Sequence, residues 1–187
     1  MTMWQDIAKS GKKLVESGLV ESQFGNISVR KGDKMLITRS GVHLDKINKN
    51  SVVEVDIDRP SSLDTIASSE TIVHRTIYKN TRALSIIHAH PMFAVIESML
   101  VKKGTIVPVN IEGEFFLHEI PVVKGETGTP ELAERTAQAL GKHKGAVVLR
   151  HGTFAIGKTL EEAYFVTALI EQSCKMKYYL DLAHYRE

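Results

Sequence analysis

The sequence is poor in cysteine, since Cys174 is the only one among its 187 residues. A single thiol excludes a disulfide framework and a thiolate zinc site within one chain, and we expect Cys174 to be a small buried residue of the last helix. The sequence also lacks any apolar run near the ~20 residues that a membrane-spanning helix needs. Residues 1–6 lack the basic start and apolar stretch of a signal peptide, so we expect a cytoplasmic protein without a membrane partner.

The sequence also lacks a large excess of positive or negative charge. The chain has 24 Lys and Arg against 22 Asp and Glu, a net charge of +2, and no block of five like charges. This gives no electrostatic case for a nucleic acid partner, whereas a small anionic substrate needs only local donors. The composition, with 43% hydrophobic and 25% charged residues, is that of an ordinary globular protein, and the length predicts one domain over residues 1–187.

Hydrophobic periodicity and turn residues predict a mixture of helices and strands. The expected helices are residues 4–17, 69–80, 91–102, 130–141 and 159–187. The expected strands are residues 24–30, 34–38, 52–57, 83–88, 106–109, 114–123, 146–150 and 154–157, with a loop at 59–67. We therefore predict an α/β fold of the α+β type, in which helices flank a central, mainly antiparallel sheet.

Three of the eight histidines stand at the ends of expected strands. His88 and His90 are two residues apart, so on an extended chain both imidazoles project from the same face. His151 follows the strand at 146–150, and two strands that end together would bring the three imidazoles into one place. Three protein nitrogens with an open fourth position are typical of a catalytic zinc site. A lone His-x-His pair is also compatible with solvated or hydrogen-bonded histidines, so spacing alone leaves both interpretations open.

A carboxylate, Glu70, follows two serines at an expected helix start, where Ser68 or Ser69 is the N-cap and Glu70 lies in the first turn. A carboxylate at this position is common as compensation of the helix dipole. The functional alternative is a general base beside the metal. His74, four residues on, shares the helix face of Glu70 and is either a partner that orients it or a core histidine.

Three short clusters of glycine and polar residues lie outside this set. They are the Gly-Asn-Ile-Ser run at 25–28, Ser40 with Gly41, and Ser68 with Ser69. Each offers backbone N–H groups, hydroxyls or amides without positive charge, which is how a phosphate is cradled near a helix N-terminus. Each alone is compatible with a turn, whereas together they indicate an anion pocket.

Taken in order, these motifs resemble those of the class II aldolase/adducin family over about residues 5–180. The matching runs are Gly-Asn-Ile-Ser at 25–28, Leu-Ile-Thr-Arg-Ser-Gly at 36–41, Ser-Ser-Glu at 68–70, His-Ala-His-Pro at 88–91 and His-Gly at 151–152. The family implies the predicted fold and a homotetramer with active sites at subunit interfaces. It also implies a zinc-dependent cleavage of a phosphorylated sugar, L-fuculose 1-phosphate or a similar ketose 1-phosphate, into dihydroxyacetone phosphate and an aldehyde such as L-lactaldehyde. A metal-stabilised enediolate is the implied intermediate.

The resemblance also implies a role for each matched residue. His88, His90 and His151 would be the zinc ligands, one Zn²⁺ per subunit. Glu70 would be the acid/base and would occupy the fourth zinc position before substrate binds. The phosphate pocket would consist of Gly25, Asn26, Ser40, Gly41, Ser68 and Ser69.

The aldehyde side departs from the family pattern. Family members that cleave fuculose phosphate carry a tyrosine, which protonates the aldehyde oxygen, at a position where an ungapped alignment from Pro108 places Glu112. We expect Glu112 to take that role, reaching the site across a subunit interface, and this requires a pKa raised by burial. Tyr185 or water is the alternative donor, and Tyr178 and Tyr179 are expected to pack on the last helix.

Other members of the family have different functions, which are the alternatives to aldol cleavage. Ribulose-5-phosphate 4-epimerases carry the same histidines but typically have aspartate where Glu70 stands. Methylthioribulose-1-phosphate dehydratases share the three histidines. Adducin-like modules keep the fold for assembly and lose the metal ligands, which this sequence retains. Three imidazoles also accept cobalt, nickel or manganese, so the sequence leaves the native metal open.

Overall fold

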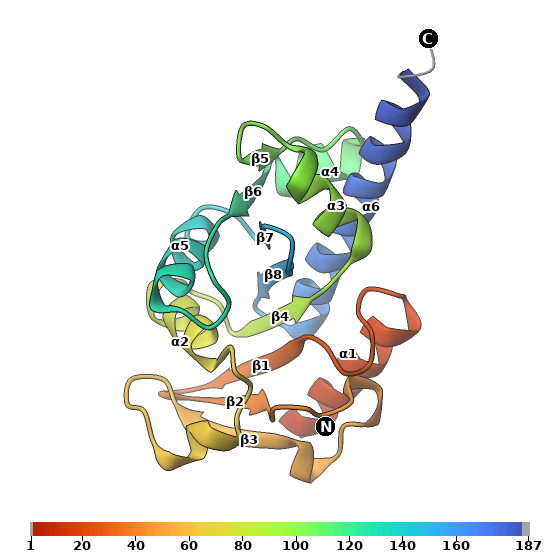
Figure 1. The fold of residues 1–187 in the computed structure, drawn as a ribbon. Helices are drawn as coiled ribbons and strands as arrows, with labels where there is room; N and C mark the ends of the chain where they lie inside the picture. Colours follow the sequence, from red (N-terminus) through yellow and green to blue (C-terminus); the bar gives the residue numbers. More distant parts are fainter. Residues whose placement is uncertain (1, 185–187) are drawn as a thin grey trace.

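One eight-stranded sheet organises the chain in the computed structural model, which describes residues 2–184 (Figure 1). The strands are β1 (Asn26–Lys31), β2 (Lys34–Thr38), β3 (Val52–Asp56), β4 (Ser85–Ala89), β5 (Thr105–Ile106), β6 (Ile120–Val123), β7 (Gly145–Val148) and β8 (Gly152–Gly157). Their order across the sheet is β3-β2-β1-β4-β8-β7-β6-β5. Every neighbouring pair is antiparallel except β6 and β7, so the expected mainly antiparallel sheet is confirmed.

Helices cover both faces of this sheet. The α-helices are α1 (Met3–Glu16), α2 (Thr71–Asn80), α3 (Met92–Leu100), α4 (Ile111–Leu117), α5 (Pro130–Leu140) and α6 (Leu160–His184). Three 3₁₀ turns, η1 (Leu44–Lys46), η2 (Lys49–Ser51) and η3 (Ser62–Ile66), lie in the connections on either side of β3. Among the described residues, no helix is both long and apolar enough to cross a membrane.

The side chains of β4 show how the two faces are separated. Ile86 packs in a core cluster with residues of α2 and α5, whereas Ile87 packs in a cluster with residues of α1 and the start of α6. A third cluster joins α3 and α6 and contains Cys174, which is fully buried as expected. Because side chains alternate along a strand, a strand covered on both faces is apolar at nearly every position, which explains the unbroken Ile-Ile run.

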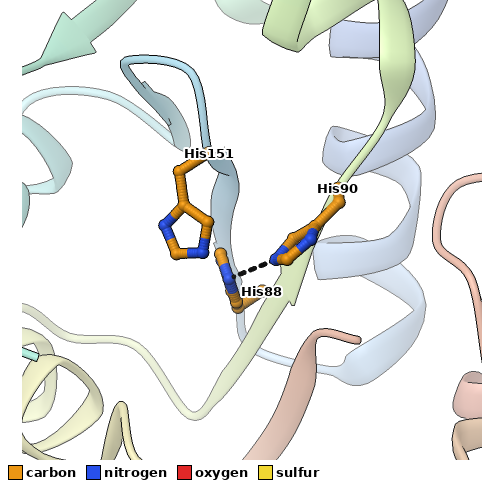
Figure 2. Close-up of side chains that lie close together, drawn as sticks. All are labelled: His88, His90 and His151. Atoms are coloured by element: carbon orange, nitrogen blue, oxygen red, sulfur yellow. Dashed lines mark hydrogen bonds between the residues drawn. The ribbon is translucent and has the colours of Figure 1, made fainter. Parts of the chain in front are cut away.

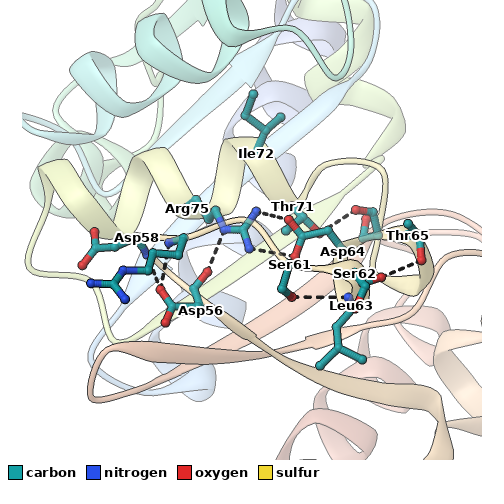
Figure 3. A network of polar contacts seen from close by, with 12 residues as sticks. Asp56, Asp58, Ser61, Ser62, Leu63, Asp64, Thr65, Thr71, Ile72 and Arg75 are labelled. Atoms are coloured by element: carbon teal, nitrogen blue, oxygen red, sulfur yellow. Dashed lines mark hydrogen bonds and ion pairs between the residues drawn. The ribbon is translucent and has the colours of Figure 1, made fainter.

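An ion pair fixes the start of α2 relative to the sheet (Figure 3). The Arg75 guanidinium donates to both oxygens of Asp64 in η3, at 2.5 and 2.8 Å, and its Nε donates to the backbone carbonyl of Asp56 at the end of β3. A bidentate, half-buried pair of this kind holds a loop more firmly than an exposed pair. The loop at 59–67 is thereby held in place just before Ser68, Ser69 and Glu70.

The chain between α3 and β6 differs from the sequence prediction. The expected strand at 106–109 is reduced to β5, and the first half of the expected strand at 114–123 is the helix α4. Gly113 allows this helix to pack closely on α6, because a side chain there would collide with the Ser173 hydroxyl of α6. The chain is therefore folded locally to fit α6, and tertiary packing overrides the strand propensity of the neighbouring apolar residues.

Candidate active site

The structure brings His88, His90 and His151 together in a three-fold arrangement (Figure 2). Their ring centroids are 4.8 Å apart in each of the three pairs, and one nitrogen from each ring lies within 4.8 Å of the others. β4 and β7 are both antiparallel to β8, which lies between them, so they run in the same direction and end at the same edge of the sheet. The expected convergence of the two strand ends is therefore observed.

Close backbone approach brings these strand ends together. A side chain at Gly152 would collide with the carbonyl of Ala89, and one at Gly25 would lie 2.5 Å from the carbonyl of His88. β7 ends at Val148 rather than at 150, because Arg150 has a positive φ of 61° and turns the chain into β8. His151 consequently lies in the tight β7–β8 turn, and not in an extension of the strand.

The segment that follows His90 is anchored by α6. Both oxygens of Glu171 accept hydrogen bonds from the first turn of α3, from the backbone N–H groups of Phe93 (3.0 Å) and Ala94 (2.8 Å). A carboxylate at this end of a helix satisfies two otherwise free donors and compensates the helix dipole. Pro91 lies at the N-cap of α3 and Glu171 fixes the helix start, so the backbone that carries His90 is held from both sides.

The proton on His88 is fixed by its backbone partner. Its Nδ1 lies 2.9 Å from the carbonyl oxygen of Thr153, which only accepts, so Nδ1 donates and Nε2 is bare. Burial lowers the pKa values of His88 and His90 to about 3, so both rings are neutral. A neutral imidazole whose second nitrogen is held by a carbonyl is the form in which histidine binds a metal.

Glu70 lies beside these rings. It occupies the N-cap of α2, one residue before the expected first turn, and its side chain makes no cap hydrogen bond. Instead Oε2 lies 3.0 Å from Nε2 of His88, and Oε1 lies 3.9 Å from Nδ1 of His151. Burial raises the pKa of Glu70, while the neighbouring His151 and the Asn26 amide oppose that rise. The dipole-compensating interpretation of Glu70 is therefore wrong for its side chain, which points at the histidine cluster.

The donor set fits a divalent transition metal. Among the described residues, both oxygens of Glu70 and Nδ1 of His151 are buried without a hydrogen-bond partner. Buried polar atoms are costly unless they are paired, and here they surround the bare Nε2 of His88. A cation among them would satisfy all of these lone pairs. Three imidazoles and a carboxylate suit zinc or a neighbouring first-row metal.

A cavity of about 230 Å³ adjoins the cluster and contains the whole predicted phosphate pocket. The histidines and Glu70 form one part of its wall. The rest of the wall is polar and comes from three connections, and the lining residues predicted from the sequence are Gly25, Asn26, Ser40, Gly41, Ser68 and Ser69. Residues from the loops beside β1, β2 and α2 thus meet at the same edge of the sheet as the histidines.

The same cavity contains residues that the sequence analysis missed. Arg39 adds a permanent positive charge to a pocket that was expected to have none, and its Nε is buried without a partner among the described residues. Phe24 stacks on the ring of His90 with a centroid distance of 5.7 Å. Gln23, Val42 and Thr127 complete the lining. Arg39 lies within the recognised run at 36–41, and a charged residue beside an expected anion site was the available signal.

Two other predicted residues lie elsewhere. The side chain of His74 contacts Asn26 and Ser28 and does not contact Glu70 directly.

Glu112 is exposed in the first turn of α4 and accepts a hydrogen bond from the Asn110 amide at 3.1 Å. Its pKa is lowered by that bond and by its own backbone N–H, so the raised pKa expected of a proton donor is wrong for the single chain. Tyr178 and Tyr179 lie on the last helix, α6, and both contact Phe93 of α3, whereas Tyr185 lies outside the described residues.

Larger hollows elsewhere on the surface lack this combination of groups. One of about 910 Å³ lies at the opposite end of β4 and contains none of the converging histidines. Another, of about 660 Å³, borders His90 and His151 from the side away from Glu70 and is mainly apolar, with Val20, Met92 and Val95 in its wall. The histidine cluster therefore separates a polar cavity from an apolar one.

Comparison with known proteins agrees with this geometry. The family described as Class II Aldolase and Adducin N-terminal domain matches residues 5–178. An L-fuculose phosphate aldolase of Methanocaldococcus jannaschii is 30% identical over 168 residues, 88% of this chain and 90% of that protein. A 5-methylthioribulose-1-phosphate/5-deoxyribulose-1-phosphate aldolase of Escherichia coli is 29% identical over 89% of this chain and 79% of its own length. The crystal structure of L-fuculose-1-phosphate aldolase from Thermus thermophilus superposes with a TM-score of 0.92 at 32% identity, covering 98% of this chain and 96% of that one.

Proposed function

The chain belongs to the class II aldolase and adducin family, and from this premise we propose that it is a zinc-dependent aldolase that cleaves a ketose 1-phosphate. The products would be dihydroxyacetone phosphate and an aldehyde, with L-fuculose 1-phosphate and L-lactaldehyde as the first candidates. The observation that carries the proposal is one cavity that combines three converging histidines, a buried carboxylate and a polar wall. A non-catalytic assembly module would gain nothing from a buried, unpartnered Glu70, which costs stability.

The histidines would hold the metal. His88, His90 and His151, with Glu70 before substrate binds, would be its ligands, because one nitrogen of each ring lies within 4.8 Å of the others and Glu70 lies beside His88. When bound, the metal would polarise the ketone oxygen as a Lewis acid. Thr153 maintains the tautomer of His88, and Phe154 stacks on its ring at a centroid distance of 4.3 Å, so this ligand has little rotational freedom.

Glu70 would move the proton. In the direction of aldol addition it removes a proton from the hydroxymethyl carbon of dihydroxyacetone phosphate, and in cleavage it returns that proton. Burial raises its pKa, which makes the carboxylate a stronger base than an exposed glutamate. Its position at the start of α2, held by the Arg75–Asp64 ion pair, would keep it facing the substrate carbon.

The polar wall would bind the phosphate. The Ser40 and Ser69 side chains are exposed in the cavity wall, and Gly41 has a φ of 73°, a turn geometry that exposes backbone donors. Arg39 would supply the charge, because its unpartnered Nε–H is a donor without an acceptor. The roles of Ser68 and Gly25 would be structural as well, since Ser68 accepts a hydrogen bond from the Glu70 N–H.

A second candidate substrate is a ketose 1-phosphate with an apolar tail, such as 5-methylthioribulose or 5-deoxyribulose 1-phosphate. The apolar hollow beside His90 and His151 favours it, because a methylthio or methyl group would be buried there. The relative from Escherichia coli is named for these substrates. Both candidates share the phosphate end and the reaction, and differ in the aldehyde that leaves.

We also propose that the enzyme is a cytoplasmic homotetramer with active sites at subunit interfaces. Large apolar side chains are exposed on neighbouring surfaces of α4, α3 and α6, including Ile111 (81%), Phe115 (70%) and Met92 (63%). Exposed apolar surface of this extent is typical of a protein interface. Sedimentation velocity would test the assembly.

A substrate panel tests the function. The metal-loaded protein is incubated with L-fuculose 1-phosphate, 5-deoxyribulose 1-phosphate, 5-methylthioribulose 1-phosphate and ribulose 5-phosphate, and the products are identified by mass. Release of dihydroxyacetone phosphate supports the aldolase, whereas epimerised or dehydrated products would assign the chain to another reaction of the family. The matched control is the Glu70→Gln protein.

A further inference from the structure

A series of buried hydrogen-bonded side chains leads from the interior of the protein to the cavity and ends at Asn26. Asn26 is the first residue of β1, lies directly opposite His88 in the β1–β4 pairing, and is only 6% exposed. Behind it, Nε2 of His74 lies 2.6 Å from Oδ1 of Asn26, and Nδ1 of His74 lies 2.7 Å from the Ser28 hydroxyl. The Ser28 hydroxyl in turn lies 2.8 Å from that of Tyr78. This series of hydrogen bonds therefore connects α2, through β1, to the cavity wall.

Sequence periodicity explains how these groups meet. Asn26 and Ser28 are two apart on a strand and share a face, and His74 and Tyr78 are four apart on a helix and share a side. His74 and Ser28 are 0% exposed and Tyr78 is 1% exposed. Buried polar groups of this kind are favourable only when every member has a partner.

Only one arrangement of protons satisfies all four groups. Burial lowers the pKa of His74 to about 3, so the ring is neutral and carries one proton. The Asn26 amide oxygen only accepts, so Nε2 of His74 donates to it and Nδ1 accepts from Ser28. Ser28 then accepts from Tyr78, whose pKa burial raises above its usual value. The flipped amide would direct its oxygen at the Glu70 carboxylate, so electrostatic repulsion excludes it.

We infer that His74 is a positioning residue, which fixes the Asn26 amide so that its NH₂ group faces the cavity as a donor to the substrate phosphate. This inference rests on the proposed phosphate pocket. Without the imidazole N–H, the amide oxygen loses its donor, and only repulsion from the Glu70 carboxylate still opposes the flipped orientation, so the NH₂ group is held less firmly toward the anion. The effect of His74 on substrate binding is then exerted entirely through Asn26, and this distinguishes positioning from a general contribution to folding.

A double-mutant cycle tests the inference, with inorganic phosphate as the probe and calorimetry as the measurement, alongside KM for the ketose phosphate. His74→Phe keeps the ring volume and removes the donor, so we expect the phosphate Kd and KM to rise about tenfold with a much smaller change in kcat. His74→Gln keeps a donor and should restore most of the affinity. Asn26→Ala should weaken binding to a similar extent, and His74→Phe should add nothing in the Asn26→Ala background.

The control removes a buried hydrogen bond far from the cavity. Thr167→Val loses the bond from the Thr167 hydroxyl to the Ala163 carbonyl in α6 and should lower the free energy of unfolding without changing the phosphate Kd. Additive effects of His74→Phe and Asn26→Ala would overturn the inference and leave the aldolase proposal intact. A wild-type protein that neither binds phosphate nor cleaves a ketose phosphate would overturn the proposed function as well.

A spectroscopic measurement makes the inference testable without any variant. In wild-type protein, long-range ¹H–¹⁵N correlations of the His74 ring should show a protonated Nε2 and a bare Nδ1 at neutral pH. The opposite tautomer would mean that the Asn26 amide presents its oxygen to the cavity, and it would overturn the inference even if the variants failed to fold.

Discussion

Oε2 of Glu70 lies 3.0 Å from Nε2 of His88, and both side chains are buried. The Thr153 carbonyl keeps the proton of His88 on the far nitrogen, so an ionised Glu70 faces a bare lone pair. Two arrangements satisfy this contact, a proton on Glu70 or a cation between the two residues. Metal binding and protonation of Glu70 therefore compete for the same position.

The purified protein should contain one transition metal per chain, held by the histidine cluster. His90→Ala should lose most of the metal and the activity, because it removes one of three nitrogens that converge on one position. His143→Ala is the control, since His143 lies outside the cluster and contacts Glu119. Metal analysis checks the stoichiometry. Adding metal at 100 times its Kd should stabilise the wild-type protein by about 2.7 kcal/mol, and an unchanged metal content in His90→Ala would contradict the assignment.

Glu70→Gln should retain substrate binding and lose turnover by about 10²–10⁴-fold, because an amide cannot accept a proton. Exchange of the hydroxymethyl protons of dihydroxyacetone phosphate with deuterium, followed by NMR, isolates this step from carbon–carbon bond cleavage. Glu97→Gln provides a matched control, since Glu97 is also a buried glutamate with a raised pKa but lies in α3, outside the cavity. Exchange at the wild-type rate in Glu70→Gln would place the base on another residue.

Most of this site could be predicted from the sequence, because its residues follow local rules. Two histidines at i and i+2 on a strand share a face, and the ends of β4 and β7 meet once the order of strands is known. The position of His151 in a turn could not be predicted, since it depends on the left-handed conformation of Arg150, a residue type that rarely adopts it. The pairing of β4 with β8, on which the convergence depends, is also a non-local property of the sheet.

Contacts between distant residues explain where the prediction was wrong or incomplete. The close packing of α4 on α6 brings Gly113 to Ser173, which is 60 positions away, and no pattern around Gly113 indicates this contact. The role of His74 depends on which face of α2 meets β1. Sequence spacing left open whether it orients Glu70 or is a core histidine, and the structure shows a fully buried ring that contacts Asn26. Apolar periodicity predicts that a face is buried and does not specify its polar partners.

Arg39→Gln should raise KM for a ketose phosphate about 10- to 100-fold with little change in kcat, since one charge-assisted hydrogen bond is lost. Arg39→Lys keeps the charge but lacks the Nε–H, the atom that is buried without a partner, and should restore only part of the affinity. Arg82→Gln removes an exposed arginine outside the cavity and is the control. Steady-state kinetics checks the prediction, and an unchanged KM in Arg39→Gln would show that backbone and hydroxyl donors suffice.

The metal-free protein should lose stability as the pH falls below about 6.5. His74 has a native pKa of about 3 against an ordinary value of 6.5, so between these values the unfolded state takes up a proton that the native state does not. Unfolding is therefore favoured as the pH falls, by about 1.4 kcal/mol per pH unit for this residue. Urea unfolding at pH 7, 6 and 5 should show a shallower pH dependence for His74→Gln than for wild type, and parallel dependences would contradict the prediction.

Glu112→Gln should change kcat/KM by less than about twofold if the geometry of the single chain persists in the assembled enzyme. Glu112 is exposed and its pKa is lowered by the Asn110 amide and its own backbone N–H, so at neutral pH it is ionised and has no proton to donate. Glu114→Gln, in the same helix and also exposed, is the matched control.

A neighbouring subunit that buried Glu112 would reverse the sign of the pKa shift. In that case Glu112→Gln would slow cleavage of the ketose phosphate and spare proton exchange on dihydroxyacetone phosphate, because exchange never requires a proton on the aldehyde oxygen. Measuring both activities on the two variants therefore decides whether Glu112 belongs to the aldehyde side of the site or to the surface of α4.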